Sequence, residues 1–160
     1  MPEFQSLLER LLKNGVEFVV IGGHAAAAHG ATLVTFDLDI ACRFTPENLL
    51  RLQKVVADLH PVHRMTPKRL PLDLDAHSCR GLKNLYLSTD WGQLDCLGAV
   101  TGIGGFDAVV ENSVTLDLPF GDCRFLSLDS LIRSKQAMGR PRDREAVIQL
   151  RAIREHSGGK

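Results

Sequence analysis

Long hydrophobic runs are missing from this 160-residue sequence, and so are paired cysteines of the CxxC type. No apolar run approaches the roughly 18 residues of a membrane-spanning helix, so we expect no membrane association. The first residues, MPEFQSLLERLL, lack the basic and then apolar pattern of a secretory signal peptide. The cysteines stand singly, at Cys42, Cys79, Cys96 and Cys123. This spacing argues against a zinc knuckle or a redox motif, and it predicts reduced, buried thiols in a cytoplasmic protein.

The composition is otherwise that of an ordinary globular protein. Hydrophobic residues make up 44% of the chain and charged residues 24%, which argues against disorder. The length is sufficient for one domain with a sizeable core. We expect this single domain to cover residues 1–155, followed by a flexible tail at 156–160.

The net charge is zero, but the charges are unevenly distributed. Residues 131–160 contain 8 Lys or Arg against 3 Asp or Glu, whereas residues 1–130 contain 11 against 16. An acidic body with a basic C-terminal segment suits a metal site that faces a polyphosphate-binding helix. A solvated basic helix face explains the same composition equally well.

The stretch Phe18–Ile40, FVVIGGHAAAAHGATLVTFDLDI, contains the main candidate site. An apolar run predicts a buried strand that leads through Gly22 and Gly23 into a short helix, His24–His29. The free N–H groups at the start of such a helix attract anions, and phosphate is the usual one. His24 could contact that phosphate, although a capping or packing role is equally open.

Two aspartates follow in the apolar segment TFDLDIAC. If this segment is a strand, Asp37 and Asp39 project from one face, with their Cα atoms roughly 7 Å apart. A phosphate-binding loop and two carboxylates within one strand–helix–strand unit predict a magnesium–nucleotide site. A third carboxylate is usually needed, and Asp95 in QLDCL is the best candidate, on a strand that could pair beside Phe36–Cys42. An edge-strand charge that prevents aggregation is the alternative for Asp95.

Hydrophobic periodicity and turn residues predict an α+β fold, with a small mixed sheet flanked by helices and a helical pair at the C-terminus. Residues 60–80 and 101–106 are expected to be loops, the first with one short edge strand. Helices are expected at 3–14, 24–29, 46–59 and 127–139, with a last helix that begins at Pro141; strands are expected at 16–21, 35–42, 84–89, 93–98, 113–118 and 123–126.

The order of apolar strand, GG, HG and TxDxD resembles the nucleotidyltransferase superfamily that includes DNA polymerase beta. Gly22, Gly23, Asp37, Asp39 and Asp95 occupy the places of its glycine loop and its three acids. The segments TDWGQLDCLG and FLSLDSLIRSKQAMGRPRD resemble the small bacterial branch that includes AbiEii-type toxin nucleotidyltransferases. In that branch a lysine followed by GRxxD is characteristic, which here is Lys135 followed by residues 139–143.

The resemblance implies the minimal nucleotidyltransferase fold and transfer of a nucleoside monophosphate from an NTP to an acceptor hydroxyl or phosphate. Two Mg²⁺ ions would be held by Asp37, Asp39 and Asp95, with Asp95 also helping to deprotonate the acceptor. The implied acceptor is RNA or protein, and the implied partner of such a toxin-like enzyme is an antitoxin. The implied nucleotide-binding (ATP-binding) residues are Gly22, Gly23, His24, Thr35, Lys135 and Arg140.

One position departs from the branch. An arginine often stands two places before the threonine of TxDxD, and here that place is Leu33. This departure favours a second hypothesis, a catalytically silent nucleotide-binding or protein-interaction module on the same fold. The intact Asp37, Asp39 and Asp95 favour the enzyme.

Overall fold

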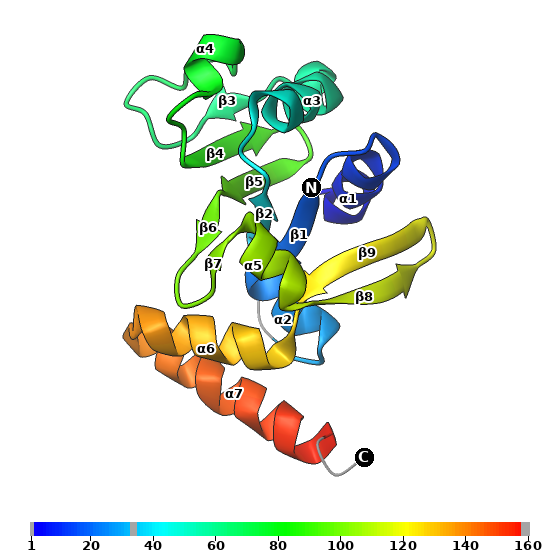
Figure 1. Ribbon diagram of the computed structural model, residues 1–160, viewed down its shortest axis with the longest axis vertical. Helices are drawn as coiled ribbons and strands as arrows, with labels where there is room; N and C mark the ends of the chain where they lie inside the picture. Colours follow the sequence, from blue (N-terminus) through cyan, green and yellow to red (C-terminus); the bar gives the residue numbers. More distant parts are fainter. Residues whose placement is uncertain (1, 33–34, 158–160) are drawn as a thin grey trace.

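A seven-stranded mixed sheet forms the centre of the computed structural model, which describes residues 2–32 and 35–157 (Figure 1). Strand β1 pairs with β2 in the antiparallel sense and with β9 in the parallel sense, and β2 pairs with β5 in parallel. The strands follow the spatial order β3 (Val62–His63), β4 (Asn84–Thr89), β5 (Gly92–Leu97), β2 (Asp37–Cys42), β1 (Phe18–Ile21), β9 (Gly121–Leu126) and β8 (Ser113–Leu118).

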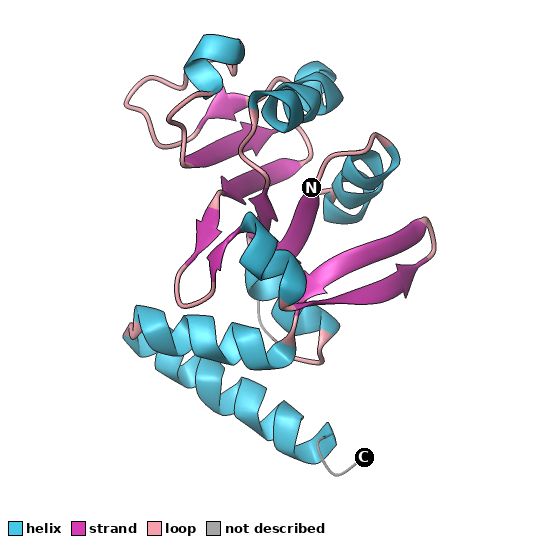
Figure 2. Ribbon diagram, in the orientation of Figure 1, coloured by secondary structure: helices cyan, strands magenta, loops and turns pink. Residues whose placement is uncertain are grey.

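Helices flank this sheet, and a two-stranded hairpin extends from it (Figure 2). Helices α6 and α7 pack on each other at one end of the molecule, at the bottom of Figure 1. Along the described chain, no helix is both long enough and apolar enough to span a membrane. The helices are α1 (Phe4–Lys13), α2 (Gly22–Ala28), α3 (Pro46–Val56), the 3₁₀ turn η1 (Ala57–Leu59), α4 (Ala76–Cys79), α5 (Phe106–Glu111), α6 (Leu128–Met138) and α7 (Pro141–Ser157); the hairpin strands are β6 (Ala99–Val100) and β7 (Gly104–Gly105).

The sheet is most deeply buried where β2 and β5 run side by side. Leu38 and Leu94 are paired in register there, as are Ile40 and Cys96, and all four are inaccessible to solvent. Apolar residues are therefore buried on the face opposite the aspartates of these strands, because successive side chains of a strand alternate between faces. Burial of this kind is the main stabilising term of the fold.

Asn48 connects α3 to the two central strands. Its side chain is buried, and its amide donates to the carbonyl oxygens of Glu17 (3.0 Å) and Arg43 (2.9 Å). Its oxygen accepts from the Glu17 backbone N–H at 2.8 Å. Because Glu17 precedes β1 and Arg43 follows β2, Asn48 fixes the ends of both strands relative to the start of α3.

Most of the predicted elements are confirmed, and the α+β class with its mixed sheet and C-terminal helical pair is correct. The glycine pair differs from the prediction. Gly22 and Gly23 form the first turn of α2 rather than a loop before it, because Gly22 adopts a positive φ of 67° that lets β1 turn directly into the helix.

The two predicted loops contain more structure than expected. Residues 60–80 include the edge strand β3, as predicted, but also the one-turn helix α4, which Asp75 and Ser78 stabilise through a capping box. Residues 101–106 were wrongly predicted to be loop throughout, since β7 lies within them and α5 begins at Phe106. Both helices are too short to show a clear periodicity in sequence.

Helix α7 ends at Ser157, so it includes the first two residues of the segment 156–160. Leu33, the position of the departure from the toxin-like branch, lies outside the described residues.

We predict that Asn48→Ala lowers the free energy of unfolding by about 2–4 kcal/mol, because the backbone groups of Glu17 and Arg43 lose buried hydrogen-bond partners. Urea denaturation would measure the change. Asn14→Ala is the control, since Asn14 is exposed and its amide donates one bond, to the Arg10 carbonyl. A loss no larger for Asn48→Ala than for Asn14→Ala would contradict the connecting role.

Candidate active site

A cavity of about 540 Å³ lies between the central strands β2 and β5 and helix α6, and all three predicted aspartates line it. One carboxylate oxygen from each of Asp37, Asp39 and Asp95 lies within 4.8 Å of the other two. The lining also includes Gly22, Lys135 and Arg140, together with residues that the sequence did not single out for this site: Arg64, Tyr86, Ser134 and Arg142.

The strand register brings the three carboxylates together. Asp39 and Asp95 are direct partners in the parallel pairing of β2 with β5. Asp37 precedes Asp39 by two residues and therefore lies on the same face of the sheet. The prediction that Asp95 lies on a strand beside Phe36–Cys42 is thus confirmed in position.

Gly22 is needed at the end of β1 because Asp39 fills the space beside it. A Cβ atom built on Gly22 would overlap Oδ2 of Asp39, and its φ of 67° is already unfavourable for other residues. Gly23 is close to a different side chain, since a Cβ there would lie 2.8 Å from Oγ1 of Thr35. The Thr35 hydroxyl in turn donates to the Asp37 carbonyl oxygen at 3.0 Å. The glycine pair therefore allows the start of α2 to approach the strand that carries the aspartates.

A basic group that the sequence analysis missed contacts the carboxylates directly. Arg64 Nη1 lies 2.5 Å from Asp95 Oδ1, and Nη2 lies 3.0 Å from Asp95 Oδ2. Nη2 is also 4.0 Å from Asp37 Oδ2. Arg64 lies in the segment between β3 and β4, where a proline-rich stretch with little periodicity gave no signal of its role.

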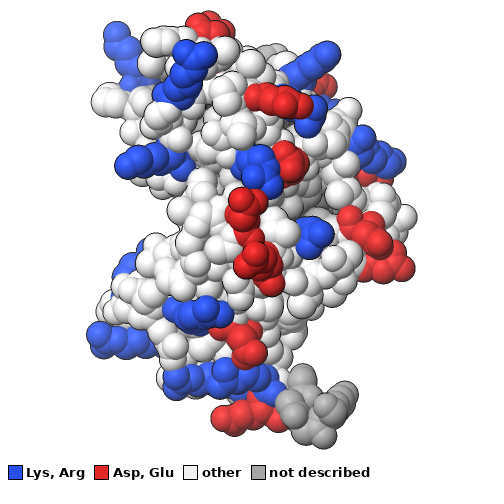
Figure 3. Space-filling view, viewed as in Figure 1, with Lys and Arg blue, Asp and Glu red and all other residues white. Residues whose placement is uncertain are grey.

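The predicted cations Lys135 and Arg140 lie on the α6 side of the cavity and share a partner. Lys135 Nζ is 3.7 Å from Asp143 Oδ1, while Arg140 donates to both carboxylate oxygens of Asp143, at 2.5 and 3.0 Å. Asp143 is almost completely buried, and its hydrogen bonds from Arg140 lower the pKa of its carboxyl group. Asp143 therefore fixes both cations at the junction of α6 and α7. Lys and Arg side chains also gather over these helices on the face drawn in Figure 3.

Comparison with solved structures identifies the architecture. The lincosamide antibiotic adenylyltransferase LnuA, bound to lincomycin, aligns with a TM-score of 0.61 at 14% identity, over 94% of this chain and 95% of its own. ANT(2″)-Ia in complex with adenylyl-2″-tobramycin aligns with a TM-score of 0.54 at 13% identity, over 96% of each chain. The chain has the nucleotidyltransferase fold. No family model and no curated protein matches the sequence.

A third structure of this fold is TM1012 from Thermotoga maritima, a candidate nucleotidyltransferase. It aligns with a TM-score of 0.57 at 15% identity, over 98% of this chain and 91% of its own. These alignments show a shared fold, and at 13–15% identity they do not assign the chain to the AbiEii-type branch.

The carboxylates of this nucleotidyltransferase fold repel one another. Burial, followed by the charges of Asp95 and Asp37, raises the pKa of Asp39 to about 7, although Lys135 opposes the shift. Burial and Asp95 also raise the pKa of Asp37, while Arg64 lowers it. Three ionised carboxylates this close together need additional positive charge.

The residues fit a divalent metal ion. Carboxylate oxygens are the ligands that Mg²⁺ prefers, and three of them converge here. Oδ1 of Asp37 is buried and has no hydrogen-bond partner among the described residues. A buried acceptor without a partner is costly, and a cation at this position would remove the cost.

His24 and Thr35 are not among the residues that line the cavity. The His24 ring packs edge-on against Phe4, with 4.7 Å between ring centroids, and burial lowers its pKa. Its Nε2 atom is buried without a partner in the described part of the chain. The structure therefore places His24 in packing against α1, and Thr35 beside Gly23 and Asp37.

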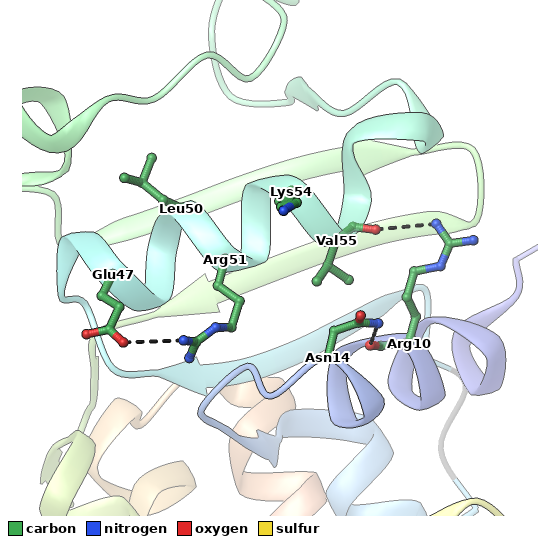
Figure 4. Close-up of a pocket in the computed structure, with 7 residues that line it drawn as sticks. All are labelled: Arg10, Asn14, Glu47, Leu50, Arg51, Lys54 and Val55. Atoms are coloured by element: carbon green, nitrogen blue, oxygen red, sulfur yellow. Dashed lines mark hydrogen bonds and ion pairs between the residues drawn. The ribbon is translucent and has the colours of Figure 1, made fainter.

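A second cavity, of about 630 Å³, lies between α1 and α3 and is larger than the first (Figure 4). Both arginines that line it are already paired: Arg51 contacts Glu47 at 3.3 Å, and Arg10 contacts Asp58 at 2.6 Å. It holds no group of converging carboxylates. Its size alone therefore does not make it the better candidate for chemistry.

Gly22→Ala should destabilise the fold more than Gly15→Ala. Gly15 has a similar φ of 74° but open space around it, so its substitution adds only backbone strain, roughly 1–2 kcal/mol. At Gly22 the overlap with Asp39 should increase the loss in free energy of unfolding by about 1–3 kcal/mol. Urea denaturation of both variants would test this, and equal losses would show that Asp39 does not restrict the position.

Asp39 should make stability depend on pH. Its pKa rises from about 4 in the unfolded chain to about 7 in the folded one, so its favourable contribution is complete below pH 4 and is lost as the pH rises through 7. Asp39→Asn removes this titration. In EDTA, the free energy of unfolding of Asp39→Asn relative to that of the wild type should therefore increase by on the order of 1–3 kcal/mol as the pH is raised from 5 to 8. Parallel stability curves for the two proteins would contradict the raised pKa.

Proposed function

We propose that this chain is a magnesium-dependent nucleotidyltransferase that moves a nucleoside monophosphate from an NTP to an acceptor hydroxyl or phosphate. The convergence of Asp37, Asp39 and Asp95 within 4.8 Å of one another, on the nucleotidyltransferase fold, carries this proposal. Support also comes from Lys135, which lies on the opposite side of the same cavity.

The carboxylates would hold the metal. Asp37 and Asp39 would bind the first ion, and Asp95 would contribute to a second. Bound Mg²⁺ supplies positive charge to the phosphate oxygens and to the attacking and leaving oxygens. The observation that favours a cation here is the buried, unpartnered Oδ1 of Asp37.

The other polar groups would position the triphosphate. Gly22 and Gly23 lie at the start of α2, where backbone N–H groups are free of intrahelical partners. Lys135 would act as a point charge toward the phosphates, whereas the guanidinium of Arg140 is largely engaged by Asp143. Arg142, which also lines the cavity, adds positive charge on the same side.

The transfer itself requires one bond to form and one to break. The acceptor oxygen forms a bond to the α-phosphorus, and the bond from that phosphorus to the bridging oxygen breaks, so pyrophosphate leaves. When the acceptor is a hydroxyl, its proton passes to a carboxylate oxygen of Asp95 that has been released from its contact with Arg64. Asp95 is placed for this role because it lies on the strand next to the two aspartates that would bind the metal.

The charge of the cavity restricts the acceptor. Against its three carboxylates stand four basic side chains, a formal charge of +1 that a bound divalent ion would raise to +3. A neutral or anionic acceptor is therefore favoured over a polycation such as an aminoglycoside. An RNA or protein hydroxyl meets this requirement and agrees with the resemblance to AbiEii-type toxins, for which an antitoxin protein would be the partner. The basic lining residues are Arg64, Lys135, Arg140 and Arg142.

The test is label transfer from α-³²P-labelled NTPs, with Mg²⁺ and either total RNA or a protein extract as acceptor. We expect Asp39→Ala to lower transfer at least about 100-fold, because a metal ligand is lost. Asp73→Ala is the matched control. Asp73 and Asp75 form another Asp-x-Asp pair in the sequence, but Asp73 is exposed and does not line the cavity, so its substitution should leave transfer unchanged. NTP binding without transfer to any acceptor would instead support the silent nucleotide-binding module.

A further inference from the structure

Arg64 holds Asp95 more completely than an ordinary surface ion pair would. Its two Nη atoms contact the two oxygens of one carboxylate, at 2.5 and 3.0 Å, which is the bidentate arrangement that gives the strongest charge-assisted hydrogen bonds. The side chains of Arg64 and Asp95 are only 16% and 10% exposed. Solvent therefore screens this pair weakly.

The position of Arg64 is fixed by its backbone and by its neighbours. Its backbone N–H donates to the Tyr86 carbonyl oxygen at 2.8 Å, which attaches the segment after β3 to strand β4. The guanidinium carbon lies 5.9 Å from the centre of the Tyr86 ring. Tyr86 is itself paired in register with Asp95, so arginine and aspartate are held by adjacent strands.

The three carboxylates are consequently unequal. Both oxygens of Asp95 are engaged by Arg64, whereas Oδ1 of Asp37 has no partner among the described residues. Arg64 approaches Asp37 only at the limit of an ion pair, with 4.0 Å between Nη2 and Oδ2. Asp37 and Asp39 are thus available to a cation, while Asp95 is already paired.

We propose that Arg64 is a positioning residue that competes with a divalent ion for Asp95. The first ion binds through Asp37 and Asp39 while Arg64 keeps Asp95 in place. A second ion that uses Asp95 has to displace at least one guanidinium contact and therefore binds more weakly. This inference rests on the proposed metal site, and it specifies how that site fills.

Removal of Arg64 should change the favoured partner of Asp95 from a guanidinium to a divalent ion. Without the guanidinium, a buried carboxylate faces Asp37 and Asp39 and has lost its direct partner, which is strongly unfavourable. A divalent ion then becomes the best available partner. Arg64→Gln should therefore be less stable than the wild type in EDTA and should gain more stability from added ions.

The experiment is a titration with Mn²⁺ alone, in which electron paramagnetic resonance reports the free ion. We expect one strong site in the wild type and a second site that Arg64→Gln strengthens by about tenfold or more. Arg64→Lys, which keeps one charge but cannot contact both oxygens, should give an intermediate affinity. Arg69→Gln is the matched control, because Arg69 is exposed on the same segment and forms no ion pair within the described chain.

Thermal unfolding with and without Mg²⁺ provides a second measurement that does not depend on activity. The rise in Tm caused by Mg²⁺ should be larger for Arg64→Gln than for the wild type or Arg69→Gln. If all proteins bind Mn²⁺ and Arg64→Gln has no additional or stronger site, the role of Arg64 is overturned while the metal site stands. If neither the wild type nor any variant binds Mn²⁺, the proposed magnesium-dependent function is overturned as well.

Discussion

The parallel pairing of β2 with β5 is the constraint on which the rest of the site depends. It places Asp39 directly opposite Asp95, and the two-residue period of a strand adds Asp37 to the same face. The chain thereby brings three like charges together on the partly buried surface of its central sheet. Three other residues of the cavity accommodate these charges. Gly22 leaves room for the carboxylate of Asp39, and Arg64 pairs with Asp95. The charge of Lys135 opposes the raised pKa of Asp39.

Burial of the apolar layer behind the site offsets the unfavourable free energy of the clustered carboxylates. Leu38, Ile40 and Leu94 alternate with the aspartates and are inaccessible to solvent, so the strands that carry the repulsion also carry a large part of the core. Asn48 holds the neighbouring strand ends with three buried hydrogen bonds. The carboxylates are therefore presented by a rigid support, which is the condition for binding an ion at fixed positions.

The sequence alone was sufficient for the parts of the site that local patterns encode. The apolar segments TFDLDIAC and QLDCL predicted two strands, with Asp37 and Asp39 on one face of the first. Ser127 and Gly139 predicted the ends of the helix that carries Lys135. Arg64 could not be found in this way, because its partner is 31 residues away and its own segment has no period. For His24 the sequence left a phosphate contact and a capping or packing role equally open. Its ring packs against Phe4, which belongs to a helix whose docking no local pattern reveals.

Asp143 has a wider consequence than its two ion pairs. It is buried at the start of α7, yet it determines where Lys135 of α6 and Arg140 of the following turn lie. The two sides of the cavity are thus built by separate parts of the molecule. The carboxylates come from the sheet, and Lys135, Arg140 and Arg142 come from α6, α7 and the turn between them. The distance between the carboxylates and these cations is set by how the α6–α7 pair docks, so it is a property of tertiary packing rather than of either side alone.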